Sequence, residues 1–526
     1  MSEAVSGLEA TWAEAMRVFG DLVVARSRGE PLDPASGSTR ALARRFHALR
    51  RALDPHLERA LAAATGPDER RAVETIRDSV AWFDEVEPLP ARSAGSGFST
   101  PPGLDGDPVV ANLRRAVFRR YGRAAAAVRV GGATFDRLTV LERLAKLDDP
   151  ADRRRHFEAL APVWRSIDGD GGRDSPYRRL VRSTADRWAR RGSPIEASAG
   201  AVGLAPGTLE PMLWSILDAW RAVTGGGWVE PWDRAHADGA AARRLDGFIP
   251  LERLQPLNDA HLAALGADRA RLGIGYDIVP RPGRPVIPVA FTIDRGVEAD
   301  DRDGWRARAP WVFATYGSGG LGNLVELLHE SGHAVQAAAV RARPAFAGYP
   351  MASAGFLEAV ADVLGWDADE PAWQRHHLGV AATAREAARH RYGAVVLDMC
   401  WALFEMAVHR DPDRRPNDVW TEITSRGLGL VPHPEWSWWA MRGQLIDGPG
   451  YLANYALSAI VAAAIRERLR ELRGDWSTGD PRWYGFMSEA LFASGSERAP
   501  ADLLRDFLGG PVTAEPLLAD LRRAAG

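Results

Sequence analysis

The stretch that decides the fold is Leu327-Leu328-His329-Glu330-Ser331-Gly332-His333-Ala334-Val335. Its apolar residues recur at helical spacing, so the sequence predicts a helix here. Histidines four residues apart project from the same face of a helix and can share one metal ion. Glu330 lies beside the first histidine, where its carboxylate can take a proton from a water that the ion activates. The stretch therefore predicts a zinc site with one Zn²⁺ per chain.

A His-Glu-x-x-His pattern also arises by chance. With 12 histidines in 526 residues, about one or two of a hundred comparable chains carry such a match. Two observations favour a metal site over chance. The surrounding sequence is helical and apolar, and a glycine-rich loop leads directly into it, Gly317-Ser318-Gly319-Gly320.

A catalytic zinc site usually has three protein ligands and one open position. Glu358, in the apolar helical run 355–364, is the candidate third ligand. Asp362 follows one turn later on the same face, where it can accept the free ring N–H of a ligand histidine. A solvated helix face is the alternative for both carboxylates, but their neighbours are nearly all apolar, and unpaired carboxylates rarely lie in such surroundings.

The composition is that of an ordinary globular protein, with 46% hydrophobic and 26% charged residues. A net charge of −3 without a strongly basic or acidic block disfavours a nucleic-acid surface or a polybasic membrane anchor. No run is long enough to cross a bilayer, and no secretory pattern opens the chain, so a cytoplasmic location is expected. The single cysteine, Cys400, lies in an apolar stretch and is expected to be a buried small side chain.

Apolar periodicity predicts a mainly α-helical chain. The expected helices cover 8–26, 41–63, 70–83, much of 108–222, 321–340, 355–364, 380–409 and 451–472, and the Gly/Pro/Ser-rich stretch 94–103 is expected to be a loop. Short β-prone runs at 273–279 and 286–293 predict a small sheet at about 270–320. We therefore expect an N-terminal helical lobe at 1–222 and a catalytic zinc lobe at 223–526, within one structural unit.

The His-Glu-x-Gly-His form, with Glu358 lying 25 residues beyond His333, resembles the thimet oligopeptidase and neurolysin family of zinc peptidases. The text at 355–364 also resembles the matching stretch of the angiotensin-converting-enzyme family. The resemblance implies a two-lobed helical metallopeptidase with a deep cleft and a small sheet beside the zinc helix. It also implies short peptides as substrates.

A second segment, 450–458, is similar to the Gly-Tyr-x-x-x-Tyr segment of thimet-type enzymes. The resemblance implies that Tyr451 and Tyr455 contact the substrate and the oxyanion. Two tyrosines four residues apart at the start of a helix lie on one face, although ordinary packing is the alternative. These families carry a histidine shortly before the first tyrosine, whereas 442–449 contains none, and His433 is the nearest.

The resemblance further implies that an extended peptide pairs with an edge strand upstream of the zinc helix. The expected stretch is 288–293, with Val289, Ala290 and Phe291 in contact with substrate, unless it is a strand of a structural hairpin. Arg442 is a candidate for holding a substrate's terminal carboxylate, and His433 for contacting substrate. The tryptophans at 436, 438 and 439 are expected to pack within a lobe, and the histidines at 376 and 377 to lie on the surface.

These patterns favour a zinc metallopeptidase that cleaves short oligopeptides, with Glu330 as general base and then general acid. Two alternatives remain. One is a zinc-dependent amide hydrolase or tailoring enzyme for a modified small molecule, which the missing histidine suggests. The other is a catalytically silent peptide-binding relative, which the presence of Glu330 disfavours. The sequence predicts no particular oligomeric state.

Overall fold

The computed structural model describes residues 1–31, 37–85, 107–283, 286–287, 289–300, 304–349 and 353–525. The chain divides into two compact units, neither of them continuous in sequence. The first unit comprises 1–94, 249–368 and 468–510, and the second comprises 95–248, 369–467 and 511–526. This division differs from the lobes expected from the sequence, because the N-terminal helices share a hydrophobic core with residues just beyond the metal motif, such as Val340 and Phe346.

Three long amphipathic helices open the first unit, and they confirm the helices expected at 8–26, 41–63 and 70–83. They are α1 (Glu3–Arg28), α2 (Thr39–Ala63) and α3 (Pro67–Glu85). Ser2 and Ser38 cap the first two by accepting hydrogen bonds from backbone N–H groups of the first turn. The expected loop at 94–103 lies outside the described residues.

A three-stranded sheet lies in the first unit, where the sequence predicts it. Its strands are β3 (Gly275–Asp277), β7 (Trp311–Phe313) and β4 (Phe291–Ile293), in the order β3-β7-β4. β3 runs parallel and β4 antiparallel to β7, with Phe291 opposite Phe313. A separate hairpin joins β5 (Val297–Asp300) to β6 (Gly304–Ala307). The strands are shorter than the runs that predict them, and β4 is an edge strand among the described residues.

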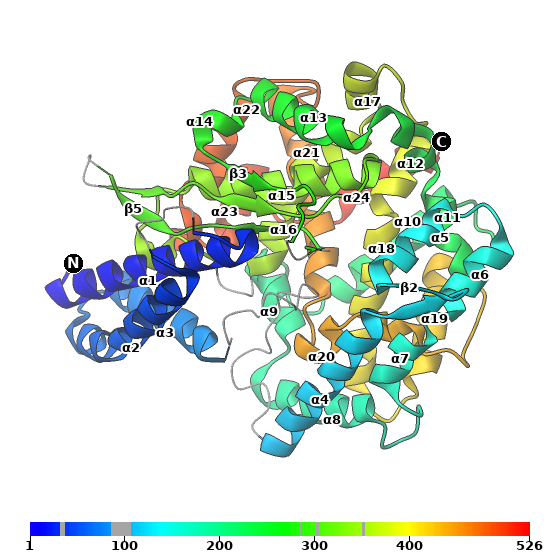
Figure 1. The fold of residues 1–526 in the computed structure, drawn as a ribbon, viewed down its shortest axis with the longest axis horizontal. Coiled ribbons are helices and arrows are strands. Elements are labelled where there is room, and N and C mark those ends of the chain that lie inside the picture. Colours follow the sequence, from blue (N-terminus) through cyan, green and yellow to red (C-terminus); the bar gives the residue numbers. More distant parts are fainter. Residues whose placement is uncertain are drawn as a thin grey trace. The chain divides into compact units, whose positions relative to one another are not determined.

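The helix that carries the metal motif, α15 (Leu321–Ala339), lies along this sheet (Figure 1). It also packs against α13 (Leu251–Ala264) and α16 (Ala354–Gly365). The remaining short elements of the unit are α14 (Arg269–Leu272), a 3₁₀ turn at Pro344–Phe346, α22 (Trp483–Met487), a π turn at Ser488–Phe492, a 3₁₀ turn at Gly495–Glu497 and α23 (Pro500–Leu508).

The second unit is almost entirely helical. It contains α4 (Pro108–Ala125), β1 (Val128–Val130), β2 (Ala133–Phe135), α5 (Arg137–Lys146), α6 (Pro150–Glu158), α7 (Ala161–Asp168), α8 (Pro176–Arg191), α9 (Pro194–Ala201), α10 (Leu209–Val223), α11 (Pro231–Asp238), α12 (Ala240–Leu245), α17 (Pro371–Leu378), α18 (Ala384–Arg410), α19 (Pro416–Leu428), α20 (Gln444–Asp447) and α24 (Glu515–Ala525). Two further elements of this unit are 3₁₀ turns at Asp246–Phe248 and Trp438–Met441, and α21 (Ala453–Arg473) begins in it. A 3₁₀ turn at Trp366–Asp369 lies where the chain passes from the first unit to the second.

α18 is the core helix of the second unit and begins at a capping box formed by Thr383 and Glu386. It is long and apolar enough to cross a membrane by length and composition, but 67% of its most apolar window is buried inside the protein. Cys400 lies in this helix and is fully buried, as expected. α18 therefore has the burial of a core helix.

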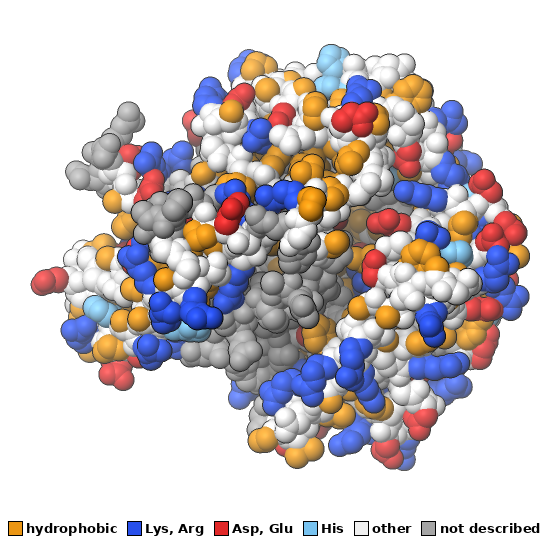
Figure 2. Space-filling model, in the orientation of Figure 1, with side chains coloured by type: hydrophobic (Ala, Val, Ile, Leu, Met, Phe, Trp, Pro, Cys, Tyr) orange, Lys and Arg blue, Asp and Glu red, His pale blue; other side chains and the backbone are white. Residues whose placement is uncertain are grey.

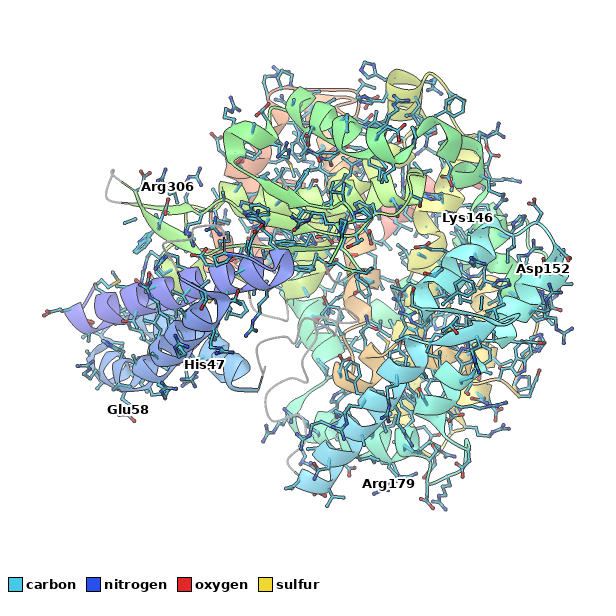
Figure 3. The ribbon with its side chains drawn as sticks, in the orientation of Figure 1. His47, Glu58, Lys146, Asp152, Arg179 and Arg306 are labelled. Atoms are coloured by element: carbon cyan, nitrogen blue, oxygen red, sulfur yellow. The ribbon has the colours of Figure 1, made fainter. Side chains whose placement is uncertain are left out.

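The mainly α-helical class expected from the sequence is thus confirmed, with small sheets as the only strands described. Basic and acidic side chains both occur across the face shown in Figure 2, in keeping with the net charge of −3. Lys146, at the end of α5, and Arg179 of α8 are exposed, and Figure 3 labels both.

Candidate metal centre

Two glycines let α15 and α16 approach closely. A Cβ atom at Gly332 would lie 2.8 Å from the Cα atom of Ala361, and one at Gly365 would lie 3.2 Å from the Cβ atom of His329. At the start of α15, Gly320 adopts a φ of 110° and donates its N–H to the Ile249 carbonyl at 2.8 Å. The glycine-rich loop and the close approach of the two helices therefore fix the axial position and the rotation of α15 against α16.

The structure brings His329, His333 and Glu358 together, each with one possible ligand atom within 4.8 Å of the others. Nε2 of His329 lies 3.4 Å from Oε2 of Glu358, and Nε2 of His333 lies 4.0 Å from the same oxygen. Two ligands about 2.0–2.1 Å from a tetrahedral zinc ion lie about 3.4 Å apart. Among the residues that the structure describes, this is the only such group of three, and its spacing and chemistry fit a zinc ion.

The contact expected for Asp362 is present. Its Oδ1 lies 2.9 Å from Nδ1 of His329, which leaves Nε2 of that ring for a metal. Burial opposes protonation of His329, but hydrogen bonds with Asp362 and Glu358 outweigh it and raise the pKa of His329 well above its usual value. Burial, followed by the charge of His329, lowers the pKa of His333 to about 4. A metal ion that binds here displaces the Nε2 proton of His329, whereas the ring of His333 is already neutral, as a ligand ring must be.

Glu330 is buried beside the metal group, and Thr292 of β4 fixes its position. The Thr292 hydroxyl lies 2.7 Å from Oε2 of Glu330 and 2.8 Å from its carbonyl oxygen. Burial raises the pKa of Glu330 to about 7, although the charge of His329 and the Thr292 hydrogen bond lower it. A carboxyl group with a pKa near neutrality can both accept and return a proton.

A polar network anchors the far side of α15. The Ser331 hydroxyl lies 2.9 Å from Oδ1 of Asn258 and 2.7 Å from the Tyr276 hydroxyl, and Asn258 donates its amide to Tyr276 at 2.8 Å. Ser331 also reaches the Leu327 carbonyl, one turn back along the helix. This network ties α15 to α13 and β3, so the motif helix is held on both faces.

The tyrosine segment belongs to the second unit. Tyr451 lies in the turn before α21 and Tyr455 in its first turn, and their ring centroids are 5.7 Å apart in a T-shaped arrangement. The two rings therefore lie side by side, as their spacing predicts. Asn454, which is buried, donates both its backbone N–H and its side-chain amide to the Tyr451 carbonyl.

Two other predicted substrate residues, also in the second unit, have partners within it. Arg442 forms an ion pair with Asp398, and its guanidinium lies over the rings of Trp401 and Tyr455. His433 stacks on Trp436 at 4.2 Å and lies 3.0 Å from Glu230 and 2.8 Å from Glu435. Their roles in substrate binding stay predictions. Trp438 and Trp439 are buried, and His376 is exposed.

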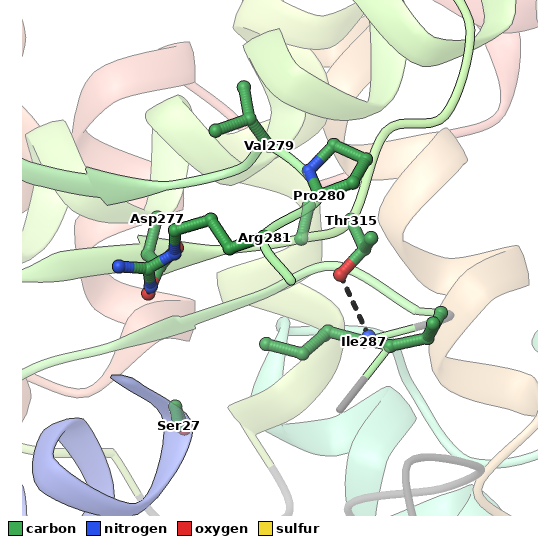
Figure 4. A pocket seen from close by; sticks show the side chains of 9 residues that line it. Ser27, Asp277, Val279, Pro280, Arg281, Ile287 and Thr315 are labelled. Atoms are coloured by element: carbon green, nitrogen blue, oxygen red, sulfur yellow. Dashed lines mark hydrogen bonds and ion pairs between the residues drawn. The ribbon is translucent and has the colours of Figure 1, made fainter. Parts of the chain in front are cut away.

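The strand stretch predicted to bind substrate is only partly a strand. Pro288 lies outside the described residues, Val289 is 42% exposed and Ala290 is buried. Phe291, the first residue of β4, stacks on Phe313 of β7. A small pocket nearby is lined by Ser27, Asp277, Val279, Pro280, Arg281, Val286, Ile287, Ala314 and Thr315, and the Ile287 N–H donates to the Thr315 hydroxyl at 2.8 Å (Figure 4). None of these side chains belongs to the metal group.

Thr292 was not predicted from the sequence as a functional residue. It lies inside the predicted strand. The only sequence pattern that bears on its role is strand alternation, which places residue 292 on the opposite face from Phe291. Which face meets α15 depends on the order of the strands, which the sequence does not carry.

No protein-family model matches this chain, and no curated protein matches it in sequence. Solved structures do match. The M32 carboxypeptidase from Deinococcus radiodurans R1 superposes with a TM-score of 0.62 at 16% identity, covering 100% of this chain and 99% of that one. Trypanosoma cruzi metallocarboxypeptidase 1 gives 0.53 at 15% identity, with 99% of each chain covered. PZ peptidase A with an inhibitor gives 0.53 at 15% identity, covering 99% of this chain and 96% of that one.

At these identities the likeness establishes the fold. The chain has the helical fold of these peptidases over its whole length, which confirms the fold class expected from the sequence.

Proposed function

We propose that this protein is a zinc-dependent peptidase that hydrolyses short peptides. The observation that carries the proposal is the convergence of His329, His333 and Glu358 beside a buried Glu330 that Thr292 holds in place. The similar folds of the two carboxypeptidases and of PZ peptidase A support it. A metal ion bound by the three side chains supplies Lewis-acid polarisation of the scissile carbonyl and of the attacking water.

Glu330 accepts a proton from the attacking water and then delivers it to the leaving nitrogen. Asp362 keeps Nδ1 of His329 protonated, so that Nε2 stays the ligand atom. By the resemblance to thimet-type enzymes, Tyr455 and also Tyr451 donate hydrogen bonds to the oxyanion. The likeness to carboxypeptidases favours release of C-terminal residues, with Arg442 as the candidate to bind the terminal carboxylate through donors that Asp398 does not use.

Paired substrates test this proposal. Zinc-loaded protein is given a panel of internally quenched peptides of 5 to 15 residues, each with a free and with an amidated C-terminus. We expect cleavage of both sets by an endopeptidase and of the free-ended set alone by a carboxypeptidase. Hydrolysis of a non-peptide amide without turnover of any peptide contradicts the peptidase proposal.

The variant Glu330→Gln tests the role of Glu330. It keeps the size of the side chain and all three metal ligands but removes the general base, so kcat should fall about 10²- to 10⁴-fold. Metal content, measured on the same sample by mass spectrometry, should stay at one ion per chain. A Glu330→Gln protein that retains wild-type kcat contradicts the mechanism, and one that loses its metal assigns Glu330 to metal binding instead.

A further inference from the structure

A buried carboxyl group in the second unit lies directly under the tyrosine segment. Glu405 of α18 is completely buried, and its Oε1 accepts the backbone N–H of Gly450 at 2.7 Å. Its other oxygen, Oε2, has no hydrogen-bond partner among the described residues. A buried acid with a single hydrogen bond is costly, so its presence needs a reason other than packing.

The turn that Glu405 holds is tightly enclosed. Gly450 has a φ of 87°, and a Cβ atom on it would lie 2.7 Å from Cγ of Pro194 and 3.3 Å from the ring of Trp188. Trp188 in turn stacks on His409 at 4.0 Å, one turn beyond Glu405 on α18. Side chains therefore enclose Gly450, and the Glu405 carboxyl supplies the partner for its N–H.

The hydrogen bonds of this turn lead directly to the two tyrosines. The Tyr451 N–H donates to the Gly448 carbonyl at 2.9 Å, and the Tyr451 carbonyl accepts from Asn454 at 2.9 Å. α21 begins at Ala453, so Tyr455 is placed by the same turn. A shift at Gly450 therefore moves both phenols.

We propose that Glu405 is a positioning residue, which fixes Tyr451 and Tyr455 for the reaction through its hydrogen bond to Gly450. This inference rests on the proposed peptidase function, in which the tyrosines stabilise the oxyanion. Glu405 does not touch substrate; it acts through the backbone of the turn. A misplacement of about 1 Å is enough to lower a rate by up to about 100-fold.

Burial raises the pKa of Glu405 to about 8, although the Gly450 N–H lowers it. Of the titratable and charged groups around this carboxyl, Tyr177 of α8 interacts with it electrostatically, and Asp168 of α7 and Arg114 of α4 act on Tyr177. The ring of His409 on α18 lies 2.8 Å from the backbone carbonyl of Glu405. Ionisation above about pH 8 places a charge in a buried site that offers it one N–H donor, which favours opening of the turn. We therefore expect kcat of the wild type to fall in this alkaline range.

Two variants separate the length of the side chain from its charge. Glu405→Asp keeps the acid but retracts it by about 1.5 Å, the length of a C–C bond, which puts the Gly450 N–H out of hydrogen-bonding reach. Glu405→Gln keeps the length and the acceptor but cannot ionise. We expect Glu405→Asp to lower kcat about 10- to 100-fold with little change in KM, and Glu405→Gln to restore most of that rate and to lose the alkaline fall.

A double-mutant cycle separates positioning from loss of stability. In a background in which both tyrosines are replaced, Tyr451→Phe with Tyr455→Phe, Glu405→Asp should lower kcat less than about 2-fold, because the two phenol hydroxyls that Glu405 places are already gone. Cys400→Ala, which trims another buried side chain of α18, should cost the same in both backgrounds. If Glu405→Asp retains wild-type kcat, or if it lowers kcat by the same factor in both backgrounds, Glu405 is not a positioning residue.

Hydrogen exchange gives a readout that does not need activity. Glu405→Asp should speed exchange of the Gly450 amide about 10-fold or more, and Glu405→Gln should leave it near the wild-type rate. Unchanged Gly450 exchange in Glu405→Asp overturns the inference. Failure of the metal-loaded wild type to cleave any peptide overturns the proposed function instead, so the two failures are distinguishable.

Discussion

Replacement of Thr292 by Val removes one hydroxyl group from the metal centre and keeps the shape of the side chain. That hydroxyl lies 2.7 Å from the buried carboxylate oxygen of Glu330. A hydrogen bond to a charged group contributes about 1.5–3 kcal/mol net. At about 1.36 kcal/mol for each tenfold in rate, its loss should lower kcat about 10- to 150-fold. Thr292→Ser keeps the donor and should recover to within about 3-fold of the wild type.

The assay is steady-state cleavage of a quenched peptide by zinc-loaded protein, with metal content measured on each sample. Ile293→Val, at the next position of β4, shortens a side chain on the opposite face of the strand and should leave kcat nearly unchanged. All three variants should hold one zinc ion per chain. Wild-type kcat in Thr292→Val refutes the view that the hydroxyl positions Glu330, and a lost metal ion places Thr292 in the binding of the ion.

Three further outcomes are expected. Asp362→Asn should weaken zinc binding about 10- to 100-fold in a chelator competition, because Oδ1 accepts from the ring of His329 at 2.9 Å. Gly332→Ala should destabilise the protein by about 1–3 kcal/mol in urea unfolding, because its Cβ atom would lie 2.8 Å from the backbone of Ala361. The control is Gly322→Ala on the same helix, whose Cβ atom meets nothing within 4 Å and which should not destabilise the protein. Burial lowers the pKa of His409 from its ordinary 6.5 to about 4. Because the unfolded chain then binds a proton that the folded chain does not, the free energy of unfolding should fall by up to about 3 kcal/mol as the pH falls from 6.5 to 4. His409→Gln should flatten this pH dependence.

The metal centre is largely readable from the sequence because its geometry is local. His329 and His333 are fixed relative to each other by one helical turn, and Glu358 and Asp362 by another. Only the approach of the two helices is non-local, and the glycine at 332 marks it in the sequence. The long amphipathic helices at the N-terminus are predictable for the same reason, since their burial pattern repeats within each segment.

The grouping of the segments is not readable in this way. Residues 1–94 belong with the zinc helix in the first unit, and 95–248 belong to the second. This grouping depends on which helices bury their apolar faces against one another. For example, Val5 and Leu8 of α1 lie in one hydrophobic core with Phe346. A hydrophobic stripe predicts that one face of a helix is buried, but it does not identify the element that packs against it. The expected boundary at residue 222 therefore rested only on a change in composition.

The strand β4 shows how such non-local information decides the chemistry. Order β3-β7-β4 leaves one backbone edge of β4 without a strand partner among the described residues, and strand alternation turns Thr292 toward α15. A peptide that pairs with this edge is aligned by the same backbone that holds Glu330 through Thr292. Peptide binding and general-base placement are then coupled, so a change in the β4 backbone should alter KM and kcat together, whereas Thr292→Val, which leaves the backbone intact, should alter kcat alone.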